Sequence, residues 1–437
     1  MRENVAVELP DVSRWIVCQI GAREHYALPR ALHRVGLLRA LVTDAWPPPG
    51  SAFRLLPGRI GERIRGRYDE GLSDARVVHF TSGLVRRELA NAARSRRGRW
   101  DILMERNAWF QEQVVRHLLQ SASLKRNGGR PHVVLAYSYA ARSILAFARD
   151  AGAITVLGQI DGGAGDEQYM KAIWARHAAT SPPPAFAPAR YWDNWRAECR
   201  LADFIVVNSL WSRQLLLDAG IEKQKIGVVP VLYQRQEDNG AIDRQYPEAF
   251  SSSRPLRVLF LGSLNIRKGV LEALVAAEQL RGEPIEFWFV GDDSDGLGRM
   301  ATPMPNVRWI GAVPRSIVGN WYGNADVFLF PTHSDGFGMT QLEAQDWGLP
   351  VVASKHCGHV VEHGRTGVIL TEVTGPAIVD CLRRLLARPQ DLAAMAREAP
   401  NRCRRFDQSA VLPILLESLA RAVRAAASSG KSGTRER

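Results

Sequence analysis

Two carboxylates lie eight residues apart in the stretch SDGFGMTQLEAQDWGLPVVAS, and glycines follow the first of them closely. Gly336 and Gly338, beside Asp335, permit backbone angles that other residues avoid, so this loop can turn sharply or approach a ligand closely. Glu343 follows near the start of an expected helix, where unpaired N–H groups and partial positive charge gather. A helix start of this kind binds anions, so the stretch could hold a phosphate between its two carboxylates.

The same stretch predicts a loop, a short helix, a turn and a strand in succession. Thr340 is followed three residues later by Glu343, which predicts a capping box at the helix start. Gly348-Leu349-Pro350 is expected to end the helix, and Val351–Ala353 to form a buried strand. The alternative is that Glu343 only closes the capping box and Asp335 is an ordinary loop residue, because short motifs also match by chance.

A second loop supplies positive charge. It follows a strand predicted over Arg257–Leu261 and starts with Gly262 and Ser263. Arg267 and Lys268 come next, and ligands in open α/β sheets bind at the edge where such loops follow the strands. Two cations, a glycine loop with free N–H groups and two carboxylates suit a nucleotide diphosphate that carries a sugar.

Strand and helix patterns alternate through both halves of the chain. Strands are predicted over Trp15–Ile20, Ala40–Val42, His132–Ala136, Ile154–Leu157, Phe204–Val207, Arg257–Leu261, Ile285–Val290, Val307–Ile310, Val327–Phe330 and Val351–Ala353. Helical segments separate most of them, as in a parallel sheet covered on both faces. The predicted fold class is therefore α/β, with two Rossmann-like doubly wound domains that face a cleft.

With 437 residues, the chain exceeds the size at which one hydrophobic core usually keeps growing, so two domains are expected. Residues 1–235 are assigned to the N-terminal domain. Residues 236–255 are polar and contain Gly, Pro and Ser, as a linker does. Residues 256–406 form the second domain, residues 407–427 an amphipathic C-terminal helix, and residues 428–437 a disordered tail.

The composition indicates a cytoplasmic protein. Hydrophobic residues make up 46% and charged residues 23%, and no apolar run reaches the ~18 residues of a membrane span. The first residues lack the apolar segment of a secretory signal. The five cysteines are few, scattered and odd in number, so we expect them to be reduced and structural.

The net charge of +12 implies anionic partners. Arginines alternate with apolar residues between Phe53 and Arg67, and this segment could lie on an anionic membrane surface. The alternative is a solvated basic surface. Nucleic acid is not an expected partner, because the arginine clusters lack stacking aromatics and no binding module is recognisable.

The run from Val258 to about Arg388 resembles the nucleotide-binding half of retaining glycosyltransferases of the GT-B fold, the family 4 or group 1 type. LFLGSLNIRKG is similar to the first loop of that half, and DGFGMTQLE to its E-x7-E motif, with Asp335 at the first acidic position. GLPVVASKHCGHVVEHGRTG resembles the segment that follows the motif. The resemblance is faint before Tyr191.

This resemblance implies roles for individual residues. Glu343 would hold the nucleotide ribose, Asp335 the sugar hydroxyls, and Lys268 the diphosphate. Gly21 would belong to a glycine loop of the N-terminal domain near the phosphates. The C-terminal helix would cross back to that domain. Backbone N–H groups that would bind the diphosphate or the sugar belong to Phe337, Gly338, Met339 and Thr340.

The family also implies the reaction, in which a sugar moves from a nucleotide-diphosphate sugar to an acceptor hydroxyl with its anomeric configuration retained. The leaving phosphate would take the acceptor proton, so no metal and no other cofactor is expected. The N-terminal domain would bind the acceptor. Its basic surface would suit a growing polysaccharide or a lipid-linked saccharide at the inner face of the membrane. A small-molecule acceptor is the alternative.

The chain departs from the family pattern at three positions. Ser263 stands where many members have an arginine, which Arg267 could replace. Asp335 is one methylene shorter than the usual Glu. Asp161 stands where members often place a histidine near the sugar, so we assign it to the acceptor side; the alternative is a turn residue before two glycines.

Rival interpretations rest on weaker patterns. Asp293-Ser294-Asp295 matches a metal-binding motif of another glycosyltransferase fold, but a surface turn explains it as well. A dinucleotide-dependent oxidoreductase would need G-x-G-x-x-G after a strand, which Gly21-Ala22-Arg23 does not supply. A non-enzymatic nucleic-acid-binding protein and a catalytically dead transferase-like scaffold are the remaining alternatives.

Overall fold

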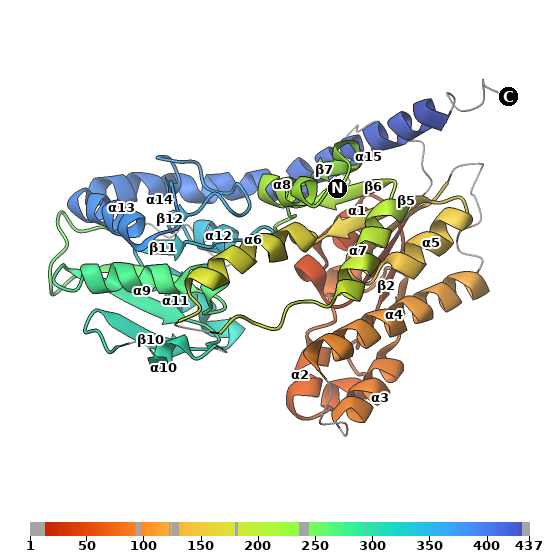
Figure 1. The fold of residues 1–437 in the computed structure, drawn as a ribbon, viewed down its shortest axis with the longest axis horizontal. Coiled ribbons are helices and arrows are strands. Elements are labelled where there is room, and N and C mark those ends of the chain that lie inside the picture. The colour runs from red at the N-terminus through yellow and green to blue at the C-terminus, as the bar shows by residue number, and fades with distance from the viewer. Residues whose placement is uncertain are drawn as a thin grey trace.

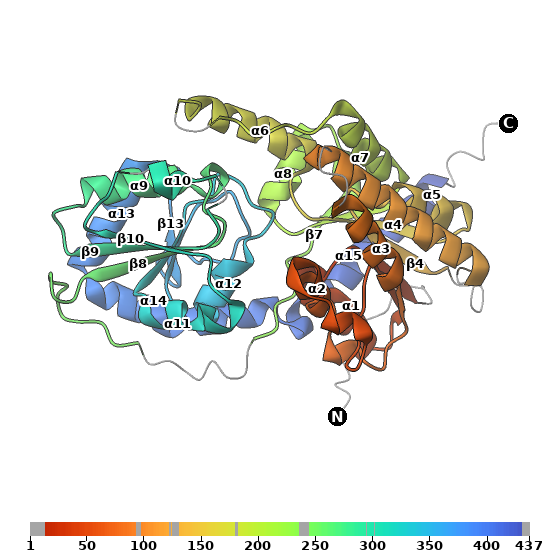
Figure 2. The same ribbon diagram turned by 90° about the horizontal axis from the view of Figure 1, so that it is seen from below.

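The computed structural model describes residues 14–92, 98–121, 124, 131–179, 182–235, 244–293, 295–300 and 302–430. Three predicted features lie wholly or partly outside these residues: the absence of a signal at the extreme N-terminus, the start of the linker (236–243) and most of the C-terminal tail (431–437). Residues 428–430, which were assigned to the tail, belong to the last helix. Two domains lie side by side, each built on its own sheet (Figures 1 and 2).

All strand pairs within the two sheets are parallel. The N-terminal domain has a seven-stranded sheet in the order β3-β2-β1-β4-β5-β6-β7, and the C-terminal domain a six-stranded sheet in the order β10-β9-β8-β11-β12-β13. The predicted α/β fold class with two Rossmann-like domains is confirmed. The strands are β1 (Trp15–Gln19), β2 (Leu38–Thr43), β3 (Val77–His79), β4 (Val133–Tyr137), β5 (Ile154–Gln159), β6 (Phe204–Val207), β7 (Ile226–Val228), β8 (Leu256–Leu261), β9 (Ile285–Val290), β10 (Val307–Gly311), β11 (Val327–Phe330), β12 (Val351–Ala353) and β13 (Gly367–Ile369).

Helices cover both faces of each sheet. The α-helices are α1 (Ala27–Arg34), α2 (Gly58–Arg65), α3 (Thr81–Ala92), α4 (Arg99–Ser121), α5 (Arg142–Asp150), α6 (Gly163–Arg176), α7 (Ala189–Leu201), α8 (Leu210–Asp218), α9 (Val270–Gln279), α10 (Leu297–Met300), α11 (Val318–Asn324), α12 (Met339–Asp346), α13 (Gly375–Ala387), α14 (Pro389–Cys403) and α15 (Gln408–Gly430). Short 3₁₀ helices are η1 (Arg23–Tyr26), η2 (Ala52–Leu55), η3 (Glu70–Leu72), η4 (Lys223–Lys225), η5 (Ile266–Lys268), η6 (Arg315–Ile317) and η7 (Arg404–Phe406).

Each sheet separates two cores. In the N-terminal domain, α1 and α15 pack on one face while α4, α5 and α7 pack on the other. In the C-terminal domain, α9, α13 and α14 cover one face and α11 and α12 the other. Burial on both faces explains why the strands are continuous apolar runs, which made them recognisable in the sequence.

The C-terminal helix leaves its own domain. α14 belongs to the core of the C-terminal domain, whereas Val411, Leu412, Leu415 and Leu419 of α15 pack into the core of the N-terminal domain. Figure 1 shows α14 on the C-terminal domain and α15 following it onto the N-terminal domain. The predicted crossing helix is therefore confirmed, and it fixes one domain against the other.

Part of the predicted linker packs on the C-terminal domain. Arg244 donates hydrogen bonds to the carbonyls of Tyr322, Ala325 and Trp347. Phe250 lies in the core of that domain. Among the described residues, no helix is long and apolar enough to cross a membrane. All five cysteines are buried and free of disulfides, as expected.

Candidate active site

The cationic loop between β8 and α9 is held rigidly against the end of β11. The side chain of Asn265 caps η5 by accepting a hydrogen bond of 3.1 Å from the Lys268 N–H. Gly269 has φ 78°, and a Cβ there would lie 2.0 Å from the carbonyl oxygen of Pro331. Only glycine fits this close approach, which places Arg267 and Lys268 at the C-terminal edge of the sheet.

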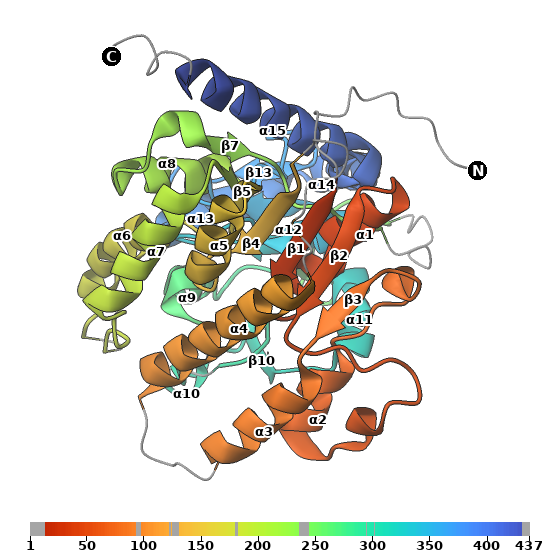
Figure 3. The same cartoon turned by 90° about the vertical axis from the view of Figure 1, so that its right-hand side faces the viewer.

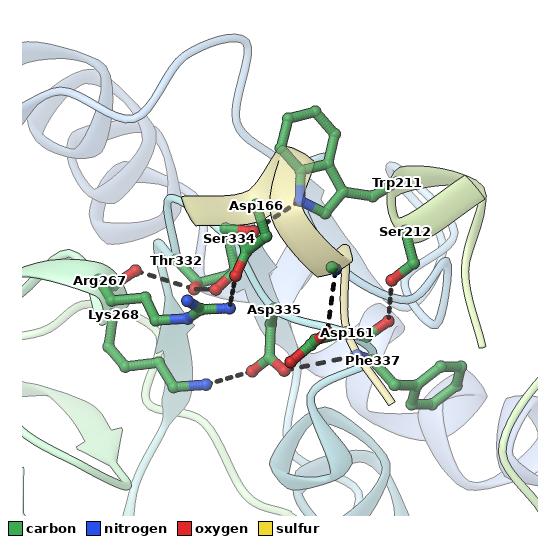
Figure 4. Close-up of polar contacts among 12 residues, drawn as sticks. Asp161, Asp166, Trp211, Ser212, Arg267, Lys268, Thr332, Ser334, Asp335 and Phe337 are labelled. Atoms are coloured by element: carbon green, nitrogen blue, oxygen red, sulfur yellow. Dashed lines mark hydrogen bonds and ion pairs between the residues drawn. The ribbon is translucent and has the colours of Figure 1, made fainter. Parts of the chain in front are cut away.

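Lys268 and Asp335 contact each other through Nζ and Oδ2 (Figure 4). Their side chains are only 23% and 20% exposed. Burial raises the pKa of Asp335, but Lys268 and then the nearby Arg267 outweigh burial and hold the pKa below its ordinary value. Asp335 is therefore an anion at neutral pH, and Lys268 Nζ also lies 5.2 Å from the centre of the Phe330 ring.

Helix α12 begins earlier than the sequence predicted. Gly338 is its N-cap with φ 83°, and no side chain caps the helix there. Thr340 thus lies inside the helix, and the predicted capping box with Glu343 is wrong, because the left-handed glycine starts the helix two residues sooner. Glu343 instead accepts a 2.9 Å hydrogen bond from the Tyr322 hydroxyl. The uncapped start leaves the N–H groups around Met339 without a side-chain acceptor.

Asp166 joins the two domains at this edge, and sequence reasoning missed it. It follows β5 in helix α6, and its carboxylate contacts Arg267 Nη2 at 2.6 Å. Ser334 donates a hydrogen bond to the same carboxylate, and Trp211 of α8 donates one of 2.8 Å to the Ser334 hydroxyl (Figure 4). Arg267 is thus bound within the cleft. No sequence pattern indicates these contacts, because Asp166 and Ser334 are 168 residues apart.

Gly336 lies where the two domains are in direct contact. A Cβ on Gly336 would lie 2.1 Å from the carbonyl oxygen of Ile160. Ser212 donates a 3.3 Å hydrogen bond to the Gly336 carbonyl. In this structure Gly336 therefore makes room for the other domain, a use that differs from the expected approach to a ligand.

Asp161 lies beside Asp335 at this junction (Figure 4). Its Oδ1 accepts hydrogen bonds from the Tyr139 hydroxyl, from Gln159 Nε2 at 2.9 Å and from the Gly163 N–H at 2.9 Å. These three hydrogen bonds fix the Asp161 carboxylate in the turn between β5 and α6.

The remaining predicted residues of the C-terminal domain lie near the end of β8. Gly262 has φ 141°, and no atom lies within 4 Å of a Cβ built there. Ser263 is exposed. Asp293 accepts hydrogen bonds from the N–H groups of Leu297 and Gly298, at 2.8 and 2.9 Å, which is the behaviour of a residue that starts a helix at a surface turn.

Gly21 follows β1 and begins a loop of the N-terminal domain whose backbone is strained. Its N–H donates a 2.9 Å hydrogen bond to Asp44, and its φ of 83° fits the glycine preference. Glu24, His25 and Tyr26 follow with φ 48°, 51° and 58°, a left-handed run that non-glycine residues rarely adopt. Strain of this kind collects at functional sites.

That loop also contacts the C-terminal domain. The His25 ring nitrogen Nε2 lies 3.2 Å from Arg315 Nη2. Burial raises the pKa of Glu24 to about 7, although a hydrogen bond from Asn208 and the charge of Arg23 lower it. Glu24, His25 and Arg315 are further cleft residues that sequence patterns did not identify.

A cavity of about 740 Å³ lies between α4, α5 and α7 of the N-terminal domain. Tyr139 and Tyr191 stack in its wall with ring centres 5.0 Å apart. Because Tyr139 also donates its hydroxyl hydrogen bond to Asp161, the cavity wall and the domain junction share a residue.

Comparisons with known proteins agree with this arrangement. Residues 255–388 match the family model described as Glycosyl transferases group 1, which confirms the sequence resemblance over that segment. D-inositol 3-phosphate glycosyltransferase of Segniliparus rotundus is 34% identical over 183 residues, which cover 39% of this chain and 41% of that protein. The capsular polysaccharide biosynthesis glycosyltransferase CapM of Staphylococcus aureus is 28% identical over 163 residues, 35% of this chain and 41% of CapM. The chain thus spans about two fifths of the length of these relatives.

Solved structures match over nearly the whole chain. Anabaena HepE in complex with UDP has a TM-score of 0.58 at 16% identity, covering 93% of this chain and 99% of that one. Sucrose-phosphate synthase of Thermosynechococcus elongatus has a TM-score of 0.60 at 17% identity, covering 95% and 100%. At this identity the likeness establishes the fold, and the two-domain architecture is that of GT-B glycosyltransferases.

Proposed function

We propose that the protein is a glycosyltransferase that moves a sugar from a nucleotide-diphosphate sugar to an acceptor hydroxyl and retains the anomeric configuration. The observation that carries this proposal is the Lys268–Asp335 contact beside the uncapped start of α12, at the sheet edge that faces the other domain. The match of residues 255–388 to group 1 glycosyl transferases supports it.

The charges suit a diphosphate leaving group. Breaking the bond between the anomeric carbon and the phosphate leaves negative charge on the diphosphate. Lys268 and the N–H groups of Phe337, Gly338, Met339 and Thr340 would stabilise that charge more strongly than the charge of the ground state, because they are fixed before the reaction. The Phe337 N–H donates a 3.4 Å hydrogen bond to Asp335 in this structure. Arg267 is a second cation in the same region, and its pairing with Asp166 offsets much of its charge in this structure.

The carboxylates suit the two sugars of such a substrate. Asp335 is ionised, so it can accept hydrogen bonds from hydroxyls of the transferred sugar. Glu343 lies further along α12, where it would accept from the nucleotide ribose while Tyr322 holds its other side. Gly262, Ser263 and Gly21 would line the diphosphate path from the ends of β8 and β1.

The acceptor would bind on the side of the N-terminal domain. Asp161 would contact it there, in the network that also holds Tyr139. A phosphate oxygen of the leaving group would take the proton of the acceptor hydroxyl, so the transfer needs no metal and no other cofactor. A saccharide on a polysaccharide, a lipid carrier or another glycoconjugate is the acceptor class we propose, in keeping with the name of CapM. The name of the D-inositol 3-phosphate glycosyltransferases instead fits the alternative of a small-molecule acceptor.

The test is transfer by the purified protein from UDP-, GDP- and ADP-sugars, followed by proton NMR of the product. We expect one nucleotide class to be consumed and the product to have the anomeric configuration of the donor. A product of opposite configuration would overturn retention while keeping transfer. If no donor is consumed with any acceptor and none binds, the protein is a scaffold of the same fold or a binding protein for other anions.

A further inference from the structure

Three potential metal ligands from different parts of the chain meet at the domain junction. His177 ends α6 in the N-terminal domain, Glu272 lies in the first turn of α9, and His333 follows β11. Nε2 of His177 lies 3.0 Å from Glu272 Oε1, and Nε2 of His333 lies 2.8 Å from the same oxygen. One ligand atom from each residue lies within 4.8 Å of the others.

Two atoms of this cluster lack hydrogen-bond partners, although they are buried. Glu272 and His333 side chains are only 8% and 4% exposed. Among the described residues, neither Glu272 Oε2 nor His333 Nε2 finds a partner in hydrogen-bonding geometry, although His333 Nε2 is close to Oε1. Buried polar atoms are nearly always paired. Glu272 Oε2 without any partner, beside an imidazole nitrogen that meets Oε1 outside hydrogen-bonding geometry, therefore needs an explanation. A bound cation supplies one.

The ligand set is chemically suitable. Two imidazole nitrogens with one carboxylate form a ligand set that zinc accepts, with a fourth position for water. Imidazole favours zinc and neighbouring transition metals over magnesium or calcium. His177 is 24% exposed, which leaves access from solvent.

We propose that His177, Glu272 and His333 bind a zinc-class divalent transition-metal ion that joins the two domains. The site is separate from the proposed transfer chemistry, which takes place at Lys268 and Asp335. It adds to an existing contact, because Met170 and Ile173 of α6 pack against Ile266 at the same junction. A bound ion would also hold the start of the loop that carries Asp335, because His333 lies at that start. The His333 N–H already donates a 2.9 Å hydrogen bond to the Arg267 carbonyl there.

The test is metal binding by the full chain, first stripped with a chelator and then loaded with Zn²⁺ or with Co²⁺ as a spectroscopic probe. We expect one ion per chain after desalting, and a Co²⁺ spectrum with the strong visible bands of a four-coordinate site. His177→Ala should weaken metal binding by at least about 10- to 100-fold, and Glu272→Gln should do the same. A loss of that size is typical when a residue that only hydrogen-bonds to a metal ligand is removed, and His177 is itself a proposed ligand. His33→Ala is the matched control, because His33 also pairs with a carboxylate, that of Asp74 at 3.0 Å, on the surface of the N-terminal domain.

The outcomes separate the proposal from its alternatives. The site is supported if the wild type and His33→Ala each bind one ion per chain and His177→Ala does not. Less than about 0.1 ion per chain in the wild type, or retention unchanged in both His177→Ala and Glu272→Gln, overturns it. His177 is partly exposed, so this variant should fold, and circular dichroism checks that it has. Because metal content is measured without substrate, failure of this site leaves the proposed glycosyl transfer untouched.

Discussion

The two sides of the cleft are built in different ways. On the C-terminal side, the chemical groups come from two short continuous segments, the loop with Arg267 and Lys268 and the loop and helix from Asp335 to Glu343. On the N-terminal side, Asp161 and Asp166 come from the turn after β5 and the start of α6, and Glu24 comes from the loop after β1. Asp166 and Glu24 are held by partners far away in the chain. Charges that bind a fixed diphosphate can be built locally, whereas contacts that define an acceptor and close a cleft depend on tertiary structure.

The largest expected effect comes from the C-terminal side. Lys268→Ala removes the cation nearest Asp335, and we expect kcat/KM for transfer to fall about 10²- to 10³-fold, as when one preorganised group facing a developing charge is removed. Lys223→Ala, an exposed lysine of the N-terminal domain, should leave the rate unchanged. Steady-state kinetics with the donor found in the screen would measure both. Equal rates for the two variants would remove Lys268 from the proposed chemistry.

The link between the two sides should show the next largest effect. Asp166→Ala leaves Arg267 and Ser334 without their shared acceptor, and we expect the free energy of unfolding to fall by about 2–4 kcal/mol. Urea denaturation measures it. Asp193→Ala is the control, because Asp193 is 73% exposed and pairs with Arg196 at 3.7 Å. If both variants lose the same small amount, Asp166 does not hold the domains together.

The strained loop of the N-terminal side should give a pH dependence. The pKa of Glu24 is about 7 in the folded protein against 4.5 for an ordinary glutamate, so between these pH values the folded state binds more protons than the unfolded state. The free energy of unfolding should therefore fall as pH rises from 4.5 to 7. Glu24→Gln should remove about 1–3 kcal/mol of that decline, whereas Glu70→Gln at an exposed position should not. Identical pH profiles for wild type and Glu24→Gln would contradict the raised pKa of this partly buried glutamate.

The smallest expected effect lies at the outer end of the N-terminal domain, where α2 and α3 lie together (Figure 3). Leu55 and Leu89 are 84% and 58% exposed there. We propose that this end touches the anionic inner face of a membrane, and Leu55→Ser should weaken co-sedimentation with anionic vesicles several-fold. Leu210→Ser, altering a leucine that is 66% exposed on α8, should not. Equal binding by both variants would favour a solvated basic surface.

Features built from one short segment could be predicted from the sequence, whereas features that depend on contacts between the domains could not. The strand Phe204–Val207 was predicted with its observed bounds, because a strand buried on both faces is a continuous apolar run. The cationic loop and the Asp335 loop were found because each is one short segment with its own pattern. Asp166, Trp211 and His25 could not be predicted, since their roles depend on contacts between domains. The capping box failed because the left-handed conformation of Gly338, packed beneath the Phe330 ring, moved the helix start.

The most direct test of the account is equilibrium binding of UDP-, GDP- and ADP-sugars to the wild type and to Lys268→Ala by isothermal titration calorimetry. We predict that one nucleotide class binds the wild type with one site per chain, and that Lys268→Ala weakens it by about 10-fold or more, as the loss of a charged contact to phosphate should. Binding of equal strength to both proteins would place the nucleotide elsewhere. Absence of binding by every nucleotide sugar at millimolar concentration would contradict the proposed function.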